Sequence, residues 1–149
     1  MSYDYDRITE RLFCGSLVRS QDDVDELVRA GVTHIIDCCE TDDRVDLGGR
    51  ADVALLWDPT ADDGKTKGVD WFAPAVDFAA GALAHPKYIV HTHCAAGVNR
   101  GPSIAYAILR SQGIDPQLAF LMLKKARPQV NVAYRNDADA ALLFQGWTR

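Results

Sequence analysis

Short apolar runs alternate with longer amphipathic stretches along the chain. Residues 33–39 (THIIDCC), 53–57 (VALLW) and 88–92 (YIVHT) are apolar and rich in β-branched side chains, as buried strands are. Residues 5–16 (YDRITERLFCGS) alternate more loosely between apolar and polar positions and predict one or two short strands. The pattern therefore predicts four or five strands, all in the first two thirds of the chain.

The stretches between and after these runs carry apolar residues at helical spacing. Ser20 followed by Asp23 is similar to a capping box, with Asp in the place of the usual Glu or Gln. Gly31 is typical of a helix end, and Asp115 before Pro116 is typical of a helix start. The predicted helices cover residues 20–31, 70–84, 102–112, 115–127 and 134–146.

Strands that alternate with helices, followed by a helical C-terminal part, indicate an α/β fold. We expect a single domain, residues 1–149, with a central, mostly parallel sheet of four to five strands flanked by helices. Two polar segments, 40–52 and 58–68, are predicted to be loops.

The composition narrows the classes of function. A net charge of -5 argues against nonspecific binding to nucleic acid or to anionic membranes. No apolar run is long enough to span a bilayer, and the N-terminus lacks a signal-peptide pattern. The cysteines at 14, 38, 39 and 94 do not form a disulfide framework. We therefore expect a cytoplasmic monomer with reduced thiols, and no nucleic-acid or membrane partner.

The stretch 91–103 (HTHCAAGVNRGPS) carries the candidate chemistry. It joins a predicted buried strand to a predicted helix, where backbone N–H groups and the helix dipole converge on one spot. Ala95, Ala96 and Gly97 are small, so the backbone can curl into an anion-binding nest. The planar guanidinium of Arg100 suits two phosphate oxygens. The same field stabilises a thiolate at Cys94.

A thiolate beneath a bound phosphate can attack the phosphorus in line, and water can then hydrolyse the phosphocysteine. The loop amides and Arg100 are suited to stabilise the charge on the equatorial oxygens of the transition state. The alternative is a buried Cys94 and a surface Arg100 spaced by chance, because Cys-x5-Arg alone is a weak pattern. The strand before it, the glycine within it and the helix after it make the complete string far more specific.

Residues 93–100, HCAAGVNR, resemble the HCxxGxxR signature of the cysteine-dependent protein tyrosine phosphatases. Nearly the whole chain is similar to the small dual-specificity branch of that superfamily. The segments that carry this similarity are ITERLFCGS (8–16), LVRAGVTHIIDC (27–38), DFAAGALAHPKYIVHTHC (77–94) and AYAILRSQGIDPQLAFLMLKKARP (105–128).

The resemblance implies a phosphatase that acts on phosphotyrosine in phosphoproteins or phosphopeptides, with phosphoserine and phosphothreonine left open. It implies Cys94 as the nucleophile and Arg100 as the phosphate clamp, with no metal and no cofactor. His93 is expected to orient the loop and to tune the thiol. The amides expected to form the phosphate cradle are those of Ala95, Ala96, Gly97, Val98, Asn99 and Arg100.

Members of this branch supply a general acid from an aspartate upstream of the cysteine. Asp62 lies 32 residues before the cysteine, which suits the dual-specificity pattern. Asp63 precedes Gly64, where a turn presents it equally well, and Asp58 belongs to WDP, a scrambled form of the Trp-Pro-Asp of the large tyrosine phosphatases. We rank Asp62 first, Asp63 second and Asp58 third, and we expect at least two of them to be ordinary loop carboxylates.

The residue after the arginine departs from the family pattern. Most relatives carry Ser or Thr there, and the hydroxyl assists departure of the cysteine thiolate, whereas this chain has Gly101. Ser103, two residues further on, is another common hydroxyl position but not the same one. We therefore expect a slow breakdown of the phosphocysteine rather than weak phosphate binding or slow attack.

Cys38 and Cys39 end a strand that should lie beside the strand leading to Cys94. Some relatives protect the nucleophile by a disulfide with a cysteine of this region, so the resemblance makes both residues candidate redox partners. We favour the simpler interpretation that both are small core residues. His91, His93 and Cys94 could suggest a zinc site, but no distal pair completes it, and we expect His91 to be a core histidine.

Other functions stay open. A catalytically weak phosphate-binding module that recognises phosphoproteins is favoured by Gly101 and by the undecided general acid, and opposed by an intact Cys94 and Arg100. A phosphatase for a non-protein ester, such as a phosphoinositide or an RNA 5′-phosphate, is disfavoured because the loop AAGVN (95–99) carries no charge. Rhodanese-type sulfur transfer also uses a loop cysteine, but with a different spacing.

Overall fold

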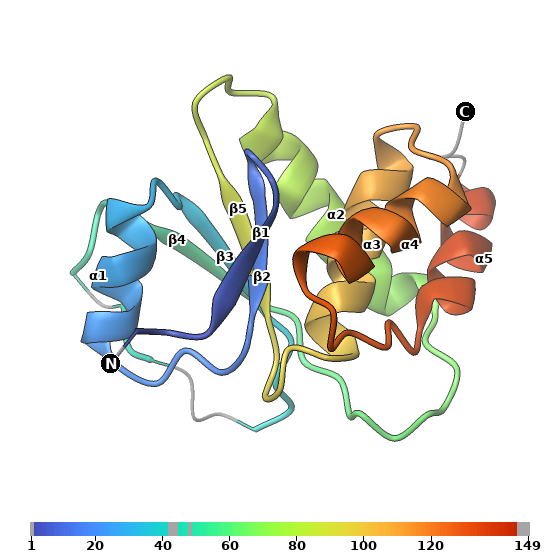
Figure 1. Ribbon diagram of the computed structural model, residues 1–149, viewed down its shortest axis with the longest axis horizontal. Helices are drawn as coiled ribbons and strands as arrows, with labels where there is room; N and C mark the ends of the chain where they lie inside the picture. Colours follow the sequence, from blue (N-terminus) through green and yellow to red (C-terminus); the bar gives the residue numbers. More distant parts are fainter. Residues whose placement is uncertain (1, 42–44, 48, 146–149) are drawn as a thin grey trace.

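A central five-stranded sheet carries helices on both of its faces (Figure 1). The computed structural model describes residues 2–41, 45–47 and 49–145. The elements in chain order are β1 (Tyr5–Thr9), β2 (Leu12–Gly15), α1 (Gln21–Arg29), β3 (His34–Asp37), β4 (Ala54–Trp57), α2 (Val69–Leu83), β5 (Val90–His93), α3 (Arg100–Ser111), α4 (Pro116–Ala126) and α5 (Arg135–Gln145).

The strands lie in the order β1-β2-β5-β3-β4. β2, β5, β3 and β4 are parallel to one another, while β1 and β2 form an antiparallel hairpin. The expected α/β fold with a mostly parallel sheet is confirmed, and residues 5–16 form two strands. Because β5 lies between β2 and β3, the chain leaves β5 at an edge where parallel strands end, which is where α/β sheets bind ligands.

The two faces of the sheet are covered unequally. α1 alone packs on one face, over a small apolar cluster that includes Phe13, Leu27 and Ile35. α2 to α5 lie on the other side of the sheet (Figure 1) and enclose the larger cluster. α3 contacts β2 and β5 as well as α2, α4 and α5, so the helix that follows the candidate loop is held from several directions.

Within the described residues, the predicted boundaries of helices and strands hold to within two residues. α3 begins at Arg100 rather than at 102, so Arg100 and Gly101 belong to its first turn. Ser20 caps α1 by accepting a hydrogen bond from the amide of Asp23, as expected. Asp23 in turn accepts from the amide of Arg19 rather than from that of Ser20, so the capping box is not closed reciprocally.

Parts of two predictions lie outside the described residues. These are positions 42–44 and 48 of the predicted loop 40–52, and the end of the last helix at residue 146. Within the part of the chain that the structure describes, no helix is long and apolar enough to cross a membrane.

Candidate active site

The loop of residues 94–99 connects the central strand β5 to α3. In Figure 1 it lies at the lower edge of the molecule, near the long loop that follows β4. Cys94, which follows the last residue of β5, is buried, and Arg100 begins α3 and is 9% exposed. The structure thus brings Cys94 and Arg100 to the two ends of a short loop between strand and helix, as the sequence predicts.

Arg127, at the end of α4, holds two peptide carbonyls of this loop. Its Nε donates to the carbonyl oxygen of Gly97 at 2.8 Å, and its Nη2 donates to that of Ala96 at 3.2 Å. The side chain is fully buried and is paired with Asp4 at 2.8 Å and with Asp6 at 2.9 Å. A buried guanidinium with carboxylate partners keeps a fixed position, so it can serve as an anchor for the loop backbone.

Two further carbonyls of the loop are held from outside it. The carbonyl of Ala95 accepts from the amide of Leu17 at 3.1 Å, and the carbonyl of Val98 accepts from the amides of residues 131 and 132, both at 3.0 Å. The N–H and C=O of a trans peptide point in opposite directions. Carbonyls fixed outward therefore turn the amides of residues 96–99 toward the inside of the loop, an arrangement that binds anions.

Gly97 allows the loop to approach Arg127 this closely. Its φ is +68°, in the left-handed region that favours glycine. A Cβ at this position would lie 2.5 Å from Nη2 of Arg127 and 2.8 Å from the backbone C and O of Gly15. The glycine of the motif is thus required by the backbone and by its neighbours.

The guanidinium of Arg100 faces the loop that follows β4. Its Nη1 donates to the carbonyl oxygen of Thr60 at 3.0 Å. Its Nε is buried and makes no hydrogen bond within the described part of the chain. A buried donor without a partner is costly, so the side chain is suited to an oxyanion that accepts from it.

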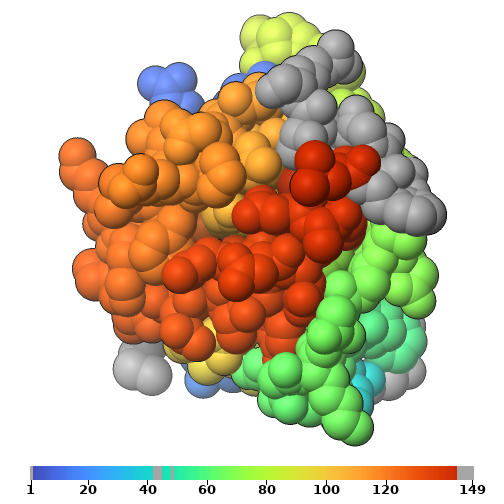
Figure 2. Space-filling model, turned by 90° about the vertical axis from the view of Figure 1, so that its right-hand side faces the viewer, coloured from blue at the N-terminus to red at the C-terminus, as the bar shows by residue number. Residues whose placement is uncertain are grey.

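Asp62 contacts the 94–99 loop directly. Its Oδ2 accepts from Nδ2 of Asn99 at 3.2 Å, and its Oδ1 accepts from the hydroxyl of Tyr134 at 2.7 Å. The same hydroxyl accepts from the amide of Gly64 at 3.0 Å. The 58–68 loop is therefore fastened both to the start of α3 and to the segment before α5, and Figure 2 shows this loop lying along α5 at the surface.

Asp63 and Asp58 have different surroundings. Asp63 pairs with Lys67 at 2.9 Å, and this hydrogen bond lowers the pKa of its carboxyl. Asp58 is buried, and its Oδ2 has no hydrogen-bond partner among the described residues. Burial, and then the charge of Asp70, raise the pKa of Asp58 to about 7. Asp62 and Asp63 are exposed, as expected of at least two of the three aspartates, whereas Asp58 is not a solvated loop carboxylate.

The two positions where a hydroxyl could assist departure of the thiolate are 101 and 103. Gly101 brings no side chain, and its carbonyl accepts from the hydroxyl of Thr92 at 2.8 Å. Ser103 is fully buried, and its Oγ accepts from the amide of Tyr134 at 3.1 Å. Ser103 thus holds the turn before α5 instead of pointing to an open site.

The two histidines of β5 are both buried. His91 shares a hydrogen bond of 2.9 Å with the hydroxyl of Tyr3, as expected of a core histidine, and burial lowers its pKa well below the usual range. His93, next to Cys94, has its Nε2 3.7 Å from Oδ1 of Asp37, at the end of the neighbouring strand β3. Its position beside the loop agrees with the orienting role that the sequence suggests.

Three further thiols lie close to Cys94. Burial, and then the charge of Cys94, raise the pKa of Cys38 well above its usual value. Burial raises the pKa of Cys39 to about 12, with the charge of Asp37 as the next cause. Burial also raises the pKa of Cys14, which sequence reasoning did not weigh, to about 12. All are buried free thiols, as core residues are.

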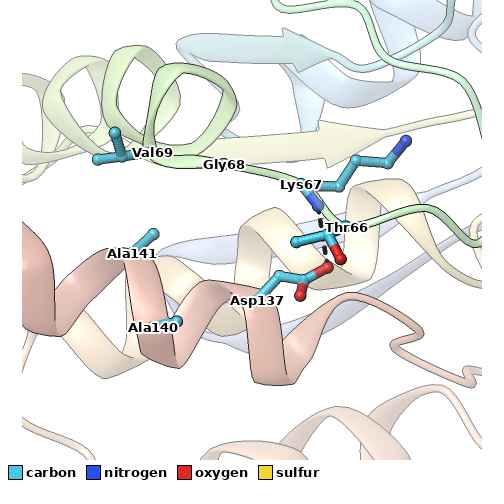
Figure 3. Close-up of a pocket in the computed structure, with 7 residues that line it drawn as sticks. All are labelled: Thr66, Lys67, Gly68, Val69, Asp137, Ala140 and Ala141. Atoms are coloured by element: carbon cyan, nitrogen blue, oxygen red, sulfur yellow. Dashed lines mark hydrogen bonds between the residues drawn. The ribbon is translucent and has the colours of Figure 1, made fainter.

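A cavity of about 280 Å³ lies beside the candidate site, between the end of the 58–68 loop and α5 (Figure 3). It is lined by Thr66, Lys67 and Val69 on one side and by Asp137 and Ala141 on the other. The amide of Lys67 donates to Oδ2 of Asp137 across it at 3.0 Å. This contact is a further attachment of the loop to α5.

The geometry is that of a loop built to hold an oxyanion above a cysteine, and a comparison with protein families agrees. The model of the dual specificity phosphatase catalytic domain matches residues 12–136. The chain belongs to this family. A dual specificity phosphatase domain is a cysteine-dependent phosphatase, so this enzyme removes phosphate from a phosphorylated substrate.

Solved structures with this fold are similar to the chain over nearly its whole length. They include a mouse putative dual specificity phosphatase complexed with zinc tungstate (22% identity, TM-score 0.80, 99% of this chain and 94% of that one). Another is the human tyrosine phosphatase-like serine/threonine/tyrosine-interacting protein (19%, 0.80, 96% and 98%). A third is PTPMT1 in complex with PI(5)P (19%, 0.76, 95% and 98%). A comparison with curated proteins finds no match.

Sequence reasoning missed Arg127 and Tyr134 as parts of this dual specificity phosphatase site. They appear in the sequence only as the end of one predicted helix and the start of another. Their partners lie far away along the chain, with Arg127 separated by 123 residues from Asp4 and Tyr134 by 72 from Asp62. No local period or spacing signals such contacts.

Proposed function

We propose that the enzyme hydrolyses phosphate monoesters of proteins through a phosphocysteine at Cys94. The observation that carries this proposal is the cradle of residues 94–100. Four successive carbonyls, those of residues 95–98, are held outward by donors from outside the loop, which turns the intervening amides inward. Arg100 completes the ring with a buried Nε that has no partner among the described residues.

In the proposed reaction, Sγ of Cys94 attacks the phosphorus, and the bond to the leaving oxygen breaks as that oxygen takes a proton from the general acid. The cradle amides and Arg100 stabilise the charge on the equatorial oxygens. Water then attacks the phosphocysteine, which releases phosphate and the Cys94 thiolate. His93 supports the loop from the end of β5, while Gly101 and Ser103 fix the first turn of α3.

We assign the proton donor to Asp62, ahead of Asp63 and Asp58. Asp62 contacts the cradle residue Asn99, whereas Asp63 is paired with Lys67. The carboxylate of Asp62 therefore lies beside the cradle, within reach of a leaving group bound there.

A protein phosphate is the substrate class that the charges favour. The cradle side chains of residues 95–99 are neutral, and the protein carries a net charge of -5. An acidic protein with a neutral cradle is poorly suited to the anionic surface of a phosphoinositide membrane. Because PTPMT1 was solved with PI(5)P, a lipid phosphate is the alternative to test.

The test compares turnover of phosphotyrosine and phosphothreonine peptides with that of PI(5)P in vesicles. We expect the peptides to be hydrolysed faster. Cys94→Ser should lower every rate by on the order of 10⁴-fold or more and still bind tungstate, because the amides remain. Faster hydrolysis of PI(5)P contradicts the substrate class, and appreciable turnover by pure Cys94→Ser contradicts the mechanism.

A phosphate-binding module with little turnover is the second candidate function. Gly101 lacks the hydroxyl that assists the second step, and one similar structure is that of a tyrosine phosphatase-like interacting protein. Stoichiometric release of leaving group from an aryl phosphate, with no further turnover, would support this candidate. Repeated turnover supports the enzyme.

A further inference from the structure

Asp37, Cys39 and His93 form a buried cluster at the carboxyl end of the sheet. Asp37 and His93 are register partners at the ends of the parallel strands β3 and β5, and Cys39 follows β3 by two residues. The exposed fractions of the three residues are 0%, 3% and 2%. One carboxylate oxygen, one thiol sulfur and one imidazole nitrogen lie within 4.8 Å of one another.

Only one of the two carboxylate oxygens of Asp37 accepts a hydrogen bond from the described residues. Its Oδ1 accepts from the amide of Cys39 at 2.8 Å. Its Oδ2 is buried and has no hydrogen-bond partner within the described ranges. Burying an unpaired carboxylate oxygen is costly unless it binds a cation or a donor.

A small cavity reaches the cluster from the α1 side. Asp37 and His93 line it, but Cys39 does not, and the other lining residues are the apolar Val18, Val24, Ile35, Val45, Leu47 and Leu55. The volume of the cavity is about 10 Å³. This is close to the room that one water or one small ion needs. The cluster therefore has three ligand atoms and, among the described residues, one carboxylate oxygen without a hydrogen bond, with a small cavity beside two of its three residues.

We propose that Asp37, Cys39 and His93 bind a zinc ion. One sulfur, one nitrogen and one oxygen ligand are the donor types that zinc takes, and a thiolate excludes the hard cations magnesium and calcium. The carboxylate and the thiolate together cancel the charge of Zn²⁺, so the buried site is neutral. The thiol proton of Cys39 is released to the solvent on binding.

The zinc site shares His93 with the proposed active site, but it uses neither Sγ of Cys94 nor the guanidinium of Arg100. It also differs from the His91, His93 and Cys94 set that the sequence suggests. Zinc binding by these three residues does not depend on which phosphate ester the enzyme hydrolyses.

The experiment titrates metal-free Cys94→Ser protein with zinc in competition with a chromophoric chelator, and with cobalt(II) to detect thiolate-to-cobalt charge transfer. The Cys94→Ser background removes the other reactive thiol. We expect one equivalent of zinc, a cobalt–thiolate band and a zinc-dependent rise in Tm. Adding Cys39→Ser should remove the band and weaken zinc binding by more than the roughly tenfold to hundredfold cost of losing an outer-shell partner.

Cys38→Ser in the same background is the matched control, because Cys38 is an adjacent buried thiol outside the cluster. It should bind zinc like its parent. Asp37→Asn is a second ligand variant and should also weaken binding, with thermal unfolding used to confirm that each variant is folded. No stoichiometric binding, loss of binding on Cys94→Ser alone, or equal binding by the Cys39→Ser and Cys38→Ser proteins overturns the proposal.

Discussion

Asp58, Asp62 and Asp63 carry the same functional group, and only their surroundings separate them. Asp62 is held between the cradle and Tyr134, Asp63 is neutralised by Lys67, and Asp58 is buried. Spacing along the chain ranks Asp62 first, and its contacts with the cradle are an independent reason to rank it first.

Replacing the true acid by its amide removes the proton and keeps the shape. We expect Asp62→Asn to lower kcat on a phosphotyrosine peptide by about 10² to 10⁴-fold. The effect should be small on an aryl phosphate whose leaving group departs without a proton. Measuring kcat on both substrates for Asp62→Asn, Asp63→Asn and Asp58→Asn decides the assignment. If kcat of Asp62→Asn stays near that of wild type while kcat of Asp63→Asn or Asp58→Asn falls strongly, the assignment is wrong.

The missing hydroxyl at Gly101 should affect only the second chemical step. A hydrogen bond to a charged group contributes about 1.5–3 kcal/mol, or on the order of tenfold to a hundredfold in rate. Ser103 and Asn99 do not obviously replace it, because their side chains bond Tyr134, Asp62 and the amide of residue 133. We therefore expect a burst of leaving group followed by slower turnover.

The structure dictates a control for this experiment. A Cβ at Gly101 would lie 3.1–3.3 Å from backbone atoms of His93 and Cys94, so any side chain there forces a small shift. Gly101→Ala carries that steric load without the hydroxyl. Gly101→Ser should turn over tenfold to a hundredfold faster than Gly101→Ala at steady state. Equal steady-state rates for the pair, or a wild-type enzyme without a burst, contradict the idea.

At the scale of elements, the end of α4 supports the cradle through Arg127. Arg127→Met keeps the length of the side chain and removes both carbonyl contacts. Because the carboxylate partners are partly exposed, we expect a loss of unfolding free energy of about 3 kcal/mol, at the low end for a buried ion pair. We also expect tungstate affinity to fall at least about tenfold, since the carbonyls are no longer fixed outward.

Arg110→Met provides the comparison for this variant. Arg110 pairs with Asp139 at 2.8 Å on the helical side of the molecule and does not contact the cradle. Arg110→Met should lower Tm without changing tungstate affinity or kcat/KM of the folded enzyme. Wild-type tungstate affinity in folded Arg127→Met would show that the cradle keeps its shape without this anchor.

Cys38 and Cys39 follow β3, and Cys94 follows the neighbouring strand β5. The arrangement of these two strands therefore decides which thiols can react with an oxidised Cys94. The redox role that the resemblance offers for these cysteines predicts that peroxide converts Cys94 to a sulfenic acid. A thiol of this region then attacks the sulfenic sulfur, which forms a disulfide and releases water. Peptide mapping of wild type, Cys38→Ala and Cys39→Ala identifies the partner. Sulfinic or sulfonic acid at Cys94 with both neighbours free shows that no protective bridge forms.

Features of the fold set by neighbours in sequence could be predicted, and features set by distant contacts could not. The Ser20 and Asp115 caps and the strand-to-helix loop depend on a few consecutive residues, and all are observed. The sequence predicts that α3 starts at residue 102, two residues later than the observed start at Arg100, because Pro102 looks like a break in the helical pattern but is not one. Proline is tolerated throughout the first turn, where its N–H is not needed. The contacts of Arg127 and Tyr134 require the folded chain.

For the molecule as a whole, the buried Asp58 links stability to pH. Burial raises the pKa of the Asp58 carboxyl from its ordinary value of 3.8 to about 7 in the folded protein. The folded state therefore holds a proton that the unfolded state has lost, so this contribution is fully present below pH 3.8 and is lost as the pH rises toward 7. Between those values the free energy of unfolding should fall by up to about 1.4 kcal/mol per pH unit from this group.

Asp58→Asn removes that dependence while keeping the shape. Urea unfolding at pH 4.5 to 7.5, in steps, gives the difference in free energy of unfolding between variant and wild type at each pH. We expect Asp58→Asn to gain relative stability as the pH rises, with the gain levelling off above about pH 7. Parallel curves for the two proteins would mean that Asp58 is ionised normally in the fold.

The outward anchoring of the cradle has a consequence for how the newly synthesised enzyme becomes active. The loop of residues 94–99 is held by Arg127 and by residues 131 and 132, and Arg127 is held in turn by Asp4 and Asp6. A nascent chain contains the nucleophile and the whole signature long before it contains these anchors. Contacts of such sequence separation form late, because loop closure must precede them. We therefore expect the growing polypeptide to be inactive toward phosphate esters during synthesis, and we expect recovered activity to mark the completion of folding rather than its beginning.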